Sequence, residues 1–240
     1  MSIQTQNLIK KYAVKTVLDL PALSIEPGEL FGLVGNNGAG KTTFFRLVLD
    51  LIQATEGHVL SKGNDVAKEV NWKSYTGSYL DESFIIDFLT PIEFFEFAGA
   101  TYEMSREKVH EELAKYEAFF SDEILGKGKR KYIRNFSKGN IQKIGIAAAM
   151  LPQPEILILD EPFANLDPTS QIRLKRMLTR LNQGKKTTIL VSSHNLSHVA
   201  DISTRILLLE KGKIVRDVLN VQNSTNGVLK ELEDYFSVEE

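Results

Sequence analysis

The residues with the clearest chemical purpose form a glycine-rich run that ends in a lysine and two hydroxyl residues. The run consists of Gly35, Asn36, Asn37, Gly38, Ala39, Gly40, Lys41, Thr42 and Thr43. Glycines let successive backbone N–H groups point at phosphate oxygens, and a helix that begins near Thr42 adds the positive end of its dipole. Lys41 then reaches the β- and γ-phosphates, and the Thr42 hydroxyl is placed to bind Mg²⁺. The pattern predicts a nucleoside triphosphate site and leaves the reaction open.

Two adjacent carboxylates follow a short apolar run further along the chain. Ile156–Leu159 is apolar without alternation, which is typical of a strand buried on both faces, and Asp160 and Glu161 come directly after it. Ligands of open parallel sheets bind outside the carboxyl ends of the strands. We therefore expect Asp160 to hold Mg²⁺, directly or through water, and Glu161 to polarise the water that attacks the γ-phosphate. The alternative is that one or both carboxylates only cap the loop before Pro162.

The segments around the glycine-rich run alternate between strand and helix patterns. Turn-forming residues separate them at 26–29 and 55–57. We expect strands at Ile3–Ile9, Leu18–Ile25, Leu30–Val34 and His58–Leu60, and a helix at Thr43–Ile52.

The middle of the chain has few strand signals. Helices are expected at Pro91–Ala100, at Arg106–Phe119 with Ser105 as its N-cap, and from Ser137 to about Leu151. We interpret residues 87–151, approximately, as a helical subdomain inserted in an α/β core. The basic run at 127–131 is interpreted as a solvated loop, with contact to anionic lipid headgroups as the weaker alternative.

Strand and helix patterns alternate again in the last third. They predict strands at Thr188–Ser192, Arg205–Glu210 and Ile214–Asp217, and helices at Thr169–Asn182, Leu196–Ile202 and Leu229–Phe236. The predicted fold class is α/β, a P-loop NTPase core with a mostly parallel central sheet, an N-terminal antiparallel β subdomain and the inserted α-helical subdomain. Residues 1–220 are expected to form this domain, and residues 221–240 a short tail.

Composition excludes several classes of protein. The 240 residues suggest one or two domains, and a net charge of −2 argues against a broadly basic nucleic-acid binder. Without cysteine there is no disulfide, thiolate catalysis or cysteine-based metal site. We expect no signal peptide and no membrane span, because the first residues have no apolar core and no long apolar run follows.

The chain resembles the ATP-binding subunits of ABC transporters over about residues 3–216, because its motifs follow one another in the order found in that family. The glycine-rich run is similar to the Walker A loop of that family, and Ile156–Glu161 to its Walker B motif. Further similar positions are Tyr12 for the aromatic that stacks on adenine, Glu82 for the Q-loop, Ser137, Gly139 and Asn140 for the signature, Asp167 for the D-loop and His194 for the switch histidine. The resemblance implies ATP and Mg²⁺ as cofactors, catalytic roles for Lys41, Glu161 and His194, and Glu82 as a further Mg²⁺ ligand.

Several of these positions also have plainer interpretations. Tyr12 can simply be packed at a strand end, and His194 can be a hydrogen-bonded histidine at a strand terminus. Asp167 before Pro168 is a good helix N-cap, which is compatible with a role at a dimer interface. Ser137 stands at an expected helix start, which is either a second anion site or a capped helix without a ligand.

The signature segment has further consequences for assembly. The resemblance implies that the signature of one subunit closes over the ATP of another, in a homodimer or in a heterodimer with a similar ATPase. Lys138 and Asn140 replace a glycine and a glutamine of the commonest signature, and Glu82 replaces the Q-loop glutamine. These departures resemble bacterial drug and antibiotic exporters of the ABC-2 kind.

The function that the resemblance implies is that of an ATP-hydrolysing subunit that powers a separate membrane permease, with an exporter as the subclass. Its location would be the cytoplasmic face of the membrane, and no nucleic acid is expected as a partner. The permease would dock beside the Q-loop, in a region rich in aromatic residues, namely Phe84, Phe88, Phe94, Phe95 and Phe97. The alternative is that most of these side chains form the core of the helical subdomain. One alternative is a soluble ABC-type ATPase that acts on a nucleic-acid or ribosomal partner. Another is a nucleotide-binding module with little turnover.

Overall fold

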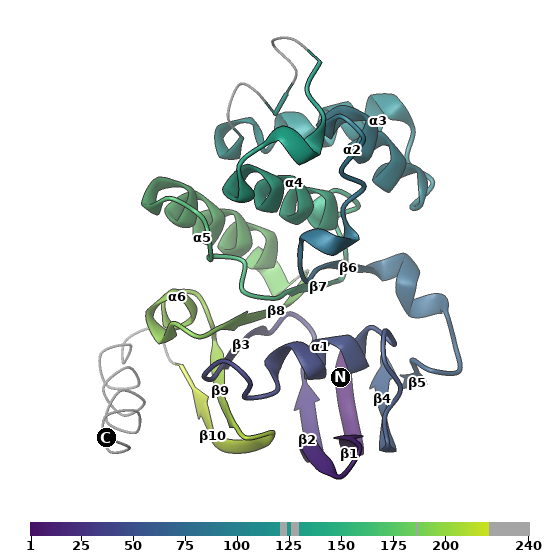
Figure 1. Ribbon diagram of the computed structural model, residues 1–240, viewed down its shortest axis with the longest axis vertical. Coiled ribbons are helices and arrows are strands. Elements are labelled where there is room, and N and C mark those ends of the chain that lie inside the picture. The colour runs from purple at the N-terminus through teal and green to yellow at the C-terminus, as the bar shows by residue number, and fades with distance from the viewer. Residues whose placement is uncertain (121–123, 126–129, 186, 221–240) are drawn as a thin grey trace.

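The structure is a computed structural model that describes residues 1–120, 124–125, 130–185 and 187–220. Three helices, α2 (Pro91–Ala100), α3 (Arg106–Ala114) and α4 (Lys138–Met150), gather at one end of the molecule, and two sheets lie toward the other (Figure 1). The helix predicted at 229–236, the tail at 221–240 and positions 126–129 of the basic run lie outside the described residues.

The N-terminal sheet is antiparallel and has the strand order β2-β1-β4-β5. Its strands are β1 (Ile3–Tyr12), β2 (Lys15–Ile25), β4 (Glu56–Ser61) and β5 (Asn64–Asp65). Alternate residues of β4 are buried toward its end, which fits a sheet with one face on the core.

The central sheet has the strand order β10-β9-β3-β8-β7-β6 and is parallel except for the edge strand β10. Every residue of β3, β7 and β8 is buried, as expected for strands covered on both faces. The predicted α/β class with one antiparallel and one mostly parallel sheet is confirmed. The strands are β3 (Leu30–Val34), β6 (Thr76–Tyr79), β7 (Ile156–Leu159), β8 (Thr188–Ser193), β9 (Arg205–Glu210) and β10 (Lys213–Leu219).

Helices cover the central sheet and build the end of the molecule at the top of Figure 1. One buried apolar cluster joins the helical end to the sheet through residues such as Phe95, Ile144 and Leu157. A second cluster packs α1 between the two sheets, with Phe44 and Phe45 fully buried. The helices are α1 (Lys41–Val48), α2 (Pro91–Ala100), α3 (Arg106–Ala114), α4 (Lys138–Met150), α5 (Pro168–Asn182) and α6 (Leu196–Ala200).

Some element boundaries differ from the sequence-based expectations. The helix expected at Thr43–Ile52 is α1, which ends at Val48, because Asp50 adopts a left-handed backbone with φ of 49°. The helix expected at Arg106–Phe119 ends at Ala114, and a separate 3₁₀ turn covers Glu117–Phe119. α6 likewise ends at Ala200 rather than Ile202.

Strand β6 was not predicted from the sequence. It has only four residues, and Gly77 and Ser78 within it give a weak strand signal. A Cβ on Gly77 would stand 2.0 Å from the Ala149 carbonyl oxygen, so the glycine lets α4 approach the strand closely.

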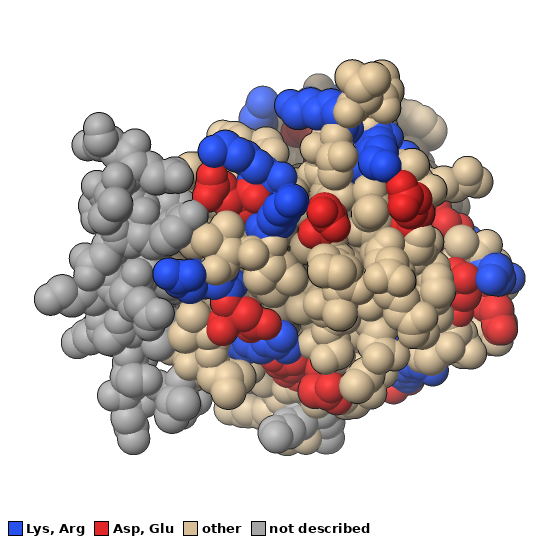
Figure 2. Space-filling model, turned by 90° about the horizontal axis from the view of Figure 1, so that it is seen from below, with Lys and Arg blue, Asp and Glu red and all other residues tan. Residues whose placement is uncertain are grey.

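Two further features of the structure are the apolar character of its helices and the distribution of charge on its surface. In the described ranges, no helix combines the length and the apolar character needed to cross a bilayer. On the face seen in Figure 2, lysine and arginine side chains are interspersed with aspartate and glutamate around uncharged areas.

Candidate functional site

The glycine-rich run forms the loop between β3 and α1. Gly40 is the N-cap of α1 and has φ of 111°, and Gly38 has φ of 83°, conformations that glycine adopts most readily. The Lys41 side chain is 6% exposed and folds back across the loop. Its Nζ donates to the Gly35 carbonyl oxygen at 2.6 Å and to the Asn36 carbonyl oxygen at 3.4 Å. The ammonium group of Lys41 therefore lies against a glycine-rich backbone loop, and loops of this kind bind phosphate through their N–H groups.

Strand order explains how distant residues meet at this loop. β8 pairs in parallel with β3 on one side and with β7 on the other, so the carboxyl ends of the three strands share one edge of the sheet. The segments that follow these strands carry Lys41, Asp160 with Glu161, and His194. This is the edge at which open parallel sheets bind ligands.

Asp160 is a buried carboxylate, 5% exposed, that joins two of these segments. Its Oδ2 accepts a hydrogen bond from the Thr42 hydroxyl at 2.5 Å, and its Oδ1 accepts one from the Ser192 hydroxyl. Burial raises the pKa of Asp160 despite these two hydrogen bonds. Sequence reasoning missed Ser192. Its place beside Asp160 follows from the parallel register of β7 and β8, which pairs Leu159 with Val191 and which the sequence alone does not show.

Glu161 lies between two cationic or ionisable side chains. Its Oε1 is 3.2 Å from Lys41 Nζ, and its Oε2 is 2.8 Å from His194 Nδ1. Its backbone has φ of 46°, which is unusual for a residue with a Cβ, and its N–H donates to the Ser192 hydroxyl at 2.9 Å. The structure thus brings together the three residues Lys41, Glu161 and His194.

The oxygen ligands expected for Mg²⁺ lie around one cavity. Glu82, Asp160 and Glu161 all line a cavity of about 230 Å³, and the Thr42 hydroxyl is hydrogen-bonded to Asp160. Hydroxyl and carboxylate oxygens are the ligands that Mg²⁺ prefers. Among the described residues, no group of three or more His, Cys, Asp or Glu side chains is arranged to hold a metal. The oxygens of these residues lie near one another, but by themselves they do not form a metal site in the part of the chain that the structure describes.

Tyr12 stands at the end of β1 and is 50% exposed, so it is not a packed core residue. It pairs with Lys15 of β2 in the antiparallel register, and Lys10 Nζ lies 4.9 Å from its ring centroid. Further along β2, the Val17 carbonyl oxygen lies 3.0 Å from where a Cβ on Gly40 would stand. The ring is therefore half-exposed and stands on the strand pair that contacts the glycine-rich loop.

The start of α4 borders the same cavity, which Lys138 lines together with Glu82, Asp160 and Glu161. Ser137 is the N-cap, and its hydroxyl accepts a hydrogen bond from the Asn140 N–H at 3.3 Å. Ser137 and Lys138 are exposed, whereas Gly139 backs against the loop after β7, where its Cβ would stand 2.5 Å from the Asn165 carbonyl oxygen. In the described ranges, no hydrogen bond or ion pair of Ser137 or Asn140 reaches the glycine-rich loop.

Asp167 follows the same loop and is the N-cap of α5. Its Oδ1 accepts a hydrogen bond from the Ser170 N–H at 3.0 Å, and its Oδ2 accepts one from the Ser170 hydroxyl. These hydrogen bonds lower the pKa of Asp167 to about 2. Lys143 Nζ of α4 lies 3.6 Å from Asp167 Oδ2. Asp167 therefore has the capping role that the sequence predicted, and its carboxylate also faces α4.

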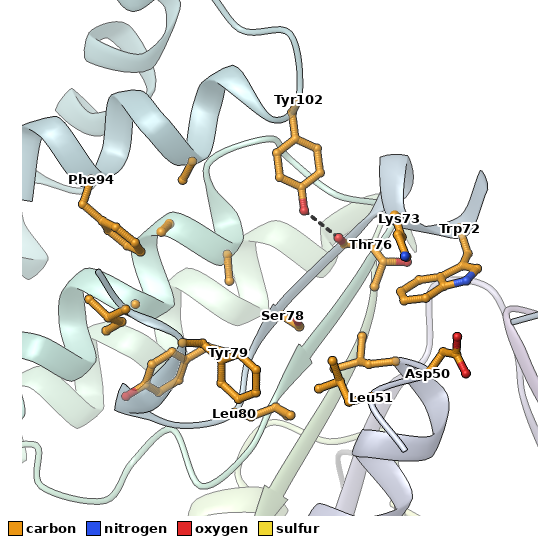
Figure 3. Close-up of a pocket in the computed structure, with 17 residues that line it drawn as sticks. Asp50, Leu51, Trp72, Lys73, Thr76, Ser78, Tyr79, Leu80, Phe94 and Tyr102 are labelled. Carbon is orange, nitrogen blue, oxygen red and sulfur yellow. Dashed lines mark hydrogen bonds between the residues drawn. The ribbon is translucent and has the colours of Figure 1, made fainter. Parts of the chain in front are cut away.

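The aromatic residues near Glu82 divide into two groups. Phe94 and Phe95 are buried in the core, whereas Phe84, Phe88 and Phe97 are each more than half exposed. A cavity of about 370 Å³ opens between α1, β6, α2 and α4 (Figure 3). Figure 3 shows Tyr102 at its border, where the hydroxyl donates to the Thr76 carbonyl oxygen at 2.8 Å. The cavity is lined by Leu49, Asp50, Leu51, Trp72, Lys73, Thr76, Ser78, Tyr79, Leu80, Phe84, Ile85, Phe94, Ala98, Tyr102, Gly145, Ala148 and Ala149.

Comparison with known proteins gives one consistent result. Residues 18–164 match the family model described as ABC transporter. The chain is 34% identical over 220 residues to the bacitracin transport ATP-binding protein BcrA of Enterococcus faecalis, covering 90% of this chain and 68% of that protein. It is 32% identical over 208 residues to the ABC transporter ATP-binding protein NatA of Bacillus subtilis, covering 86% and 82%. Two cyanobacterial relatives are longer, and the chain spans 54% and 57% of them.

Solved structures show the same fold. A structure described as the ATP-binding subunit of an ABC transporter superimposes with a TM-score of 0.85 at 23% identity, covering 99% of this chain and all of that one. A dimeric ATP-binding cassette in a post-hydrolysis state with ADP and Pi superimposes with a TM-score of 0.80 at 22% identity, covering 91% and 99%.

Proposed function

We propose that this chain, which belongs to the ABC transporter family, binds and hydrolyses ATP as the energy-supplying subunit of a membrane transporter. The observation that carries the proposal is the position of the Glu161 carboxylate, between Lys41 Nζ and His194 Nδ1 at the mouth of the glycine-rich loop. A phosphate-binding loop without such a carboxylate supports binding alone. With Glu161 beside it, the site also has a base for the attacking water.

Nucleotide binding begins with a change of partner for Lys41. In this structure its ammonium group contacts the Gly35 carbonyl oxygen and the Glu161 carboxylate. The β- and γ-phosphates offer stronger anionic partners, so Lys41 turns to them, and the backbone N–H groups from Gly35 to Thr43 bind the remaining oxygens. The exposed Tyr12 ring stacks on the adenine.

The hydrolytic step follows from the release of Glu161. With Lys41 on the phosphates, the carboxylate is free to accept a proton from a water that attacks the γ-phosphorus, and the bond to the β–γ bridging oxygen breaks to give ADP and phosphate. His194 remains within hydrogen-bond range of Glu161 and orients it together with the γ-phosphate. Thr42, Asp160 and Glu82 would hold Mg²⁺, which neutralises charge on the β- and γ-oxygens when bound.

The start of α4 supplies the second half of an ATP site in a dimer. Ser137, Gly139 and Asn140 lie at a helix N-terminus, and Ser137 is exposed to solvent. Facing another subunit head to tail, this segment covers the ATP on that subunit's loop, with Asp167 near the contact. Two such sites form in a homodimer or in a heterodimer with a similar ATPase.

The cavity in Figure 3 is the place we propose for the permease. Its walls come from the core on one side and from α2 and α4 on the other, and Phe84 at its rim is 54% exposed. A short apolar helix of a membrane protein fits such a groove through a few side-chain anchors. The chain would then sit at the cytoplasmic face of the membrane. Similarity to a bacitracin transport protein favours an exporter of the ABC-2 kind.

The experiment that tests this function compares two glutamates at opposite ends of β7. Glu161 follows the strand, and Glu155 precedes it and pairs with Lys62 on the surface at 2.6 Å. In Glu161→Gln, we expect turnover with Mg-ATP to fall by about 100-fold or more. That variant should also form a dimer that depends on ATP, seen by size-exclusion chromatography. Glu155→Gln should hydrolyse ATP like the wild type. Equal turnover in Glu161→Gln and in the wild type would reject Glu161 as the base.

A further inference from the structure

Gln142 is a buried polar side chain on the second turn of α4, and no motif in the sequence analysis includes it. It is 5% exposed. Its Nε2 donates to the Pro162 carbonyl oxygen at 2.7 Å and to the Glu161 carbonyl oxygen at 3.2 Å. Its Oε1 accepts a hydrogen bond from Asn165 Nδ2 at 3.3 Å. One amide therefore makes three hydrogen bonds to the loop that follows β7.

That loop contains two residues in the left-handed backbone region. Glu161 has φ of 46° and Asn165 has φ of 56°. Asparagine adopts this region comparatively easily, whereas the Cβ of a glutamate makes it less favourable, so contacts that hold Glu161 there matter. Gln142 binds the carbonyl of Glu161 and the side chain of Asn165, so it contacts the loop at both of these residues.

We infer that Gln142 is a positioning residue that keeps Glu161 in the backbone conformation from which its carboxylate reaches the attacking water. The inference rests on the proposed hydrolysis of ATP and adds a residue to it. Gln142 acts through Glu161, because its amide binds the backbone of Glu161 and Pro162.

The position of Gln142 on α4 gives this contact a second consequence. Gln142 is five residues after Ser137, the N-cap of the segment that we propose covers the ATP of the partner subunit. Gly139, in the first turn, packs directly against the Asn165 carbonyl oxygen, so the start of the helix and the loop are fixed to each other twice. A shift of α4 when the partner's ATP is bound is therefore transmitted to Glu161 in the same chain.

The chain offers a matched control in Gln171 of α5. Its Nε2 also donates to two carbonyl oxygens of the same loop, those of Phe163 at 3.2 Å and Leu166 at 3.1 Å. Gln171 resembles Gln142 in chemistry but contacts neither Glu161 nor α4 in its described hydrogen bonds. Gln171→Met tests general loosening of the loop, and Gln142→Met tests the specific connection to Glu161.

The experiment measures ATP turnover of the full chain in these two variants and in a double-mutant cycle with Glu161→Gln. In Gln142→Met we expect kcat to fall about 10- to 100-fold with KM for ATP within about twofold of the wild type. Gln171→Met should stay within about threefold of wild-type kcat. In the Glu161→Gln background, Gln142→Met should cause no further loss, because both substitutions remove the same carboxylate function.

Further results support or overturn the inference. In Gln142→Lys, an ammonium donor can still reach the two carbonyl oxygens, so we expect partial recovery of kcat. The Hill coefficient for ATP should fall from about two toward one in Gln142→Met but not in Gln171→Met. Wild-type kcat in Gln142→Met, or a further loss in the Glu161→Gln background, would overturn the inference while the proposed function stands. Absence of turnover in the wild type would instead overturn both.

Discussion

The glycine-rich loop and the start of α4 are the two places that we propose bind ATP, and they differ in how many of their side chains are buried and paired within this chain. At the loop, Lys41 and Asp160 are 6% and 5% exposed, and every charged group has a partner within the same chain. At the start of α4, Ser137 and Lys138 are exposed, and among the described residues the Ser137 hydroxyl accepts a hydrogen bond from its own helix. A site that is finished on one side and open on the other fits a protein whose ATP is enclosed only when two subunits meet.

Substitution of Lys41 should disable the glycine-rich loop, and we expect it to have the largest effect of the substitutions compared. Because Lys41 Nζ is the cation nearest to the phosphate position, Lys41→Ala should weaken ATP binding about 100-fold. The measurement is equilibrium binding of a fluorescent ATP analogue to the isolated subunit. Lys175→Ala is the control. Lys175 of α5 is also mostly shielded from solvent, and its Nζ forms an ion pair with Asp201 Oδ2 at 2.6 Å. Equal affinity in Lys41→Ala and Lys175→Ala would mean that the loop is not the nucleotide site.

Substitution of Ser137 should disable the start of α4 and leave the glycine-rich loop intact. An arginine at this exposed position fills the space that the partner's phosphates need, so Ser137→Arg should abolish the ATP-dependent dimer and lower turnover about tenfold or more. Affinity for one nucleotide should stay within about twofold of the wild type. Turnover with Mg-ATP and the oligomeric state of a Glu161→Gln, Ser137→Arg double variant provide the two measurements.

The control for Ser137→Arg is the same substitution at another N-cap. Ser105 caps α3 and accepts a hydrogen bond from the Lys108 N–H at 3.2 Å, so Ser105→Arg loses a comparable cap far from the proposed interface. If Ser105→Arg lowers turnover as much as Ser137→Arg, the effect is one of helix stability, and the start of α4 is not a second anion site.

The sequence predicted the strands and charged residues of the glycine-rich loop site better than it predicted the side-chain contacts and backbone conformation around them. Buried parallel strands have continuous apolar runs, so β3 and β7 were found with their correct bounds, and the charged residues after them follow directly. Ser192 and Gln142 were missed because their roles depend on which strands and helices become neighbours. The left-handed backbone of Glu161 has no local signal at all, since it is imposed by contacts from β8 and α4.

The smallest expected effect is a change in the thermal stability of the folded chain without nucleotide, caused by Asp160 beside the glycine-rich loop. Burial raises the pKa of Asp160, which means that its charged form destabilises the folded state. Asp160→Asn removes this charge and should raise Tm by a few degrees at pH 7, since about 1 kcal/mol corresponds to roughly 2–4 °C for a chain of this size. The destabilisation by wild-type Asp160 is present above its folded pKa and is relieved as the pH falls through that value.

The Tm advantage of Asp160→Asn should therefore shrink as the pH falls from 7 toward 4, while all other carboxylates titrate alike in both proteins. Thermal melting without nucleotide over this pH range measures it, with the exposed Asp87→Asn as the control for charge alone. An advantage that grows on acidification would mean that the hydrogen bonds from Thr42 and Ser192 outweigh burial, and that Asp160 is held as a carboxylate for stability. An advantage that shrinks supports the opposite view. The site would then keep a costly buried charge for a cation such as the Mg²⁺ that we propose binds with ATP.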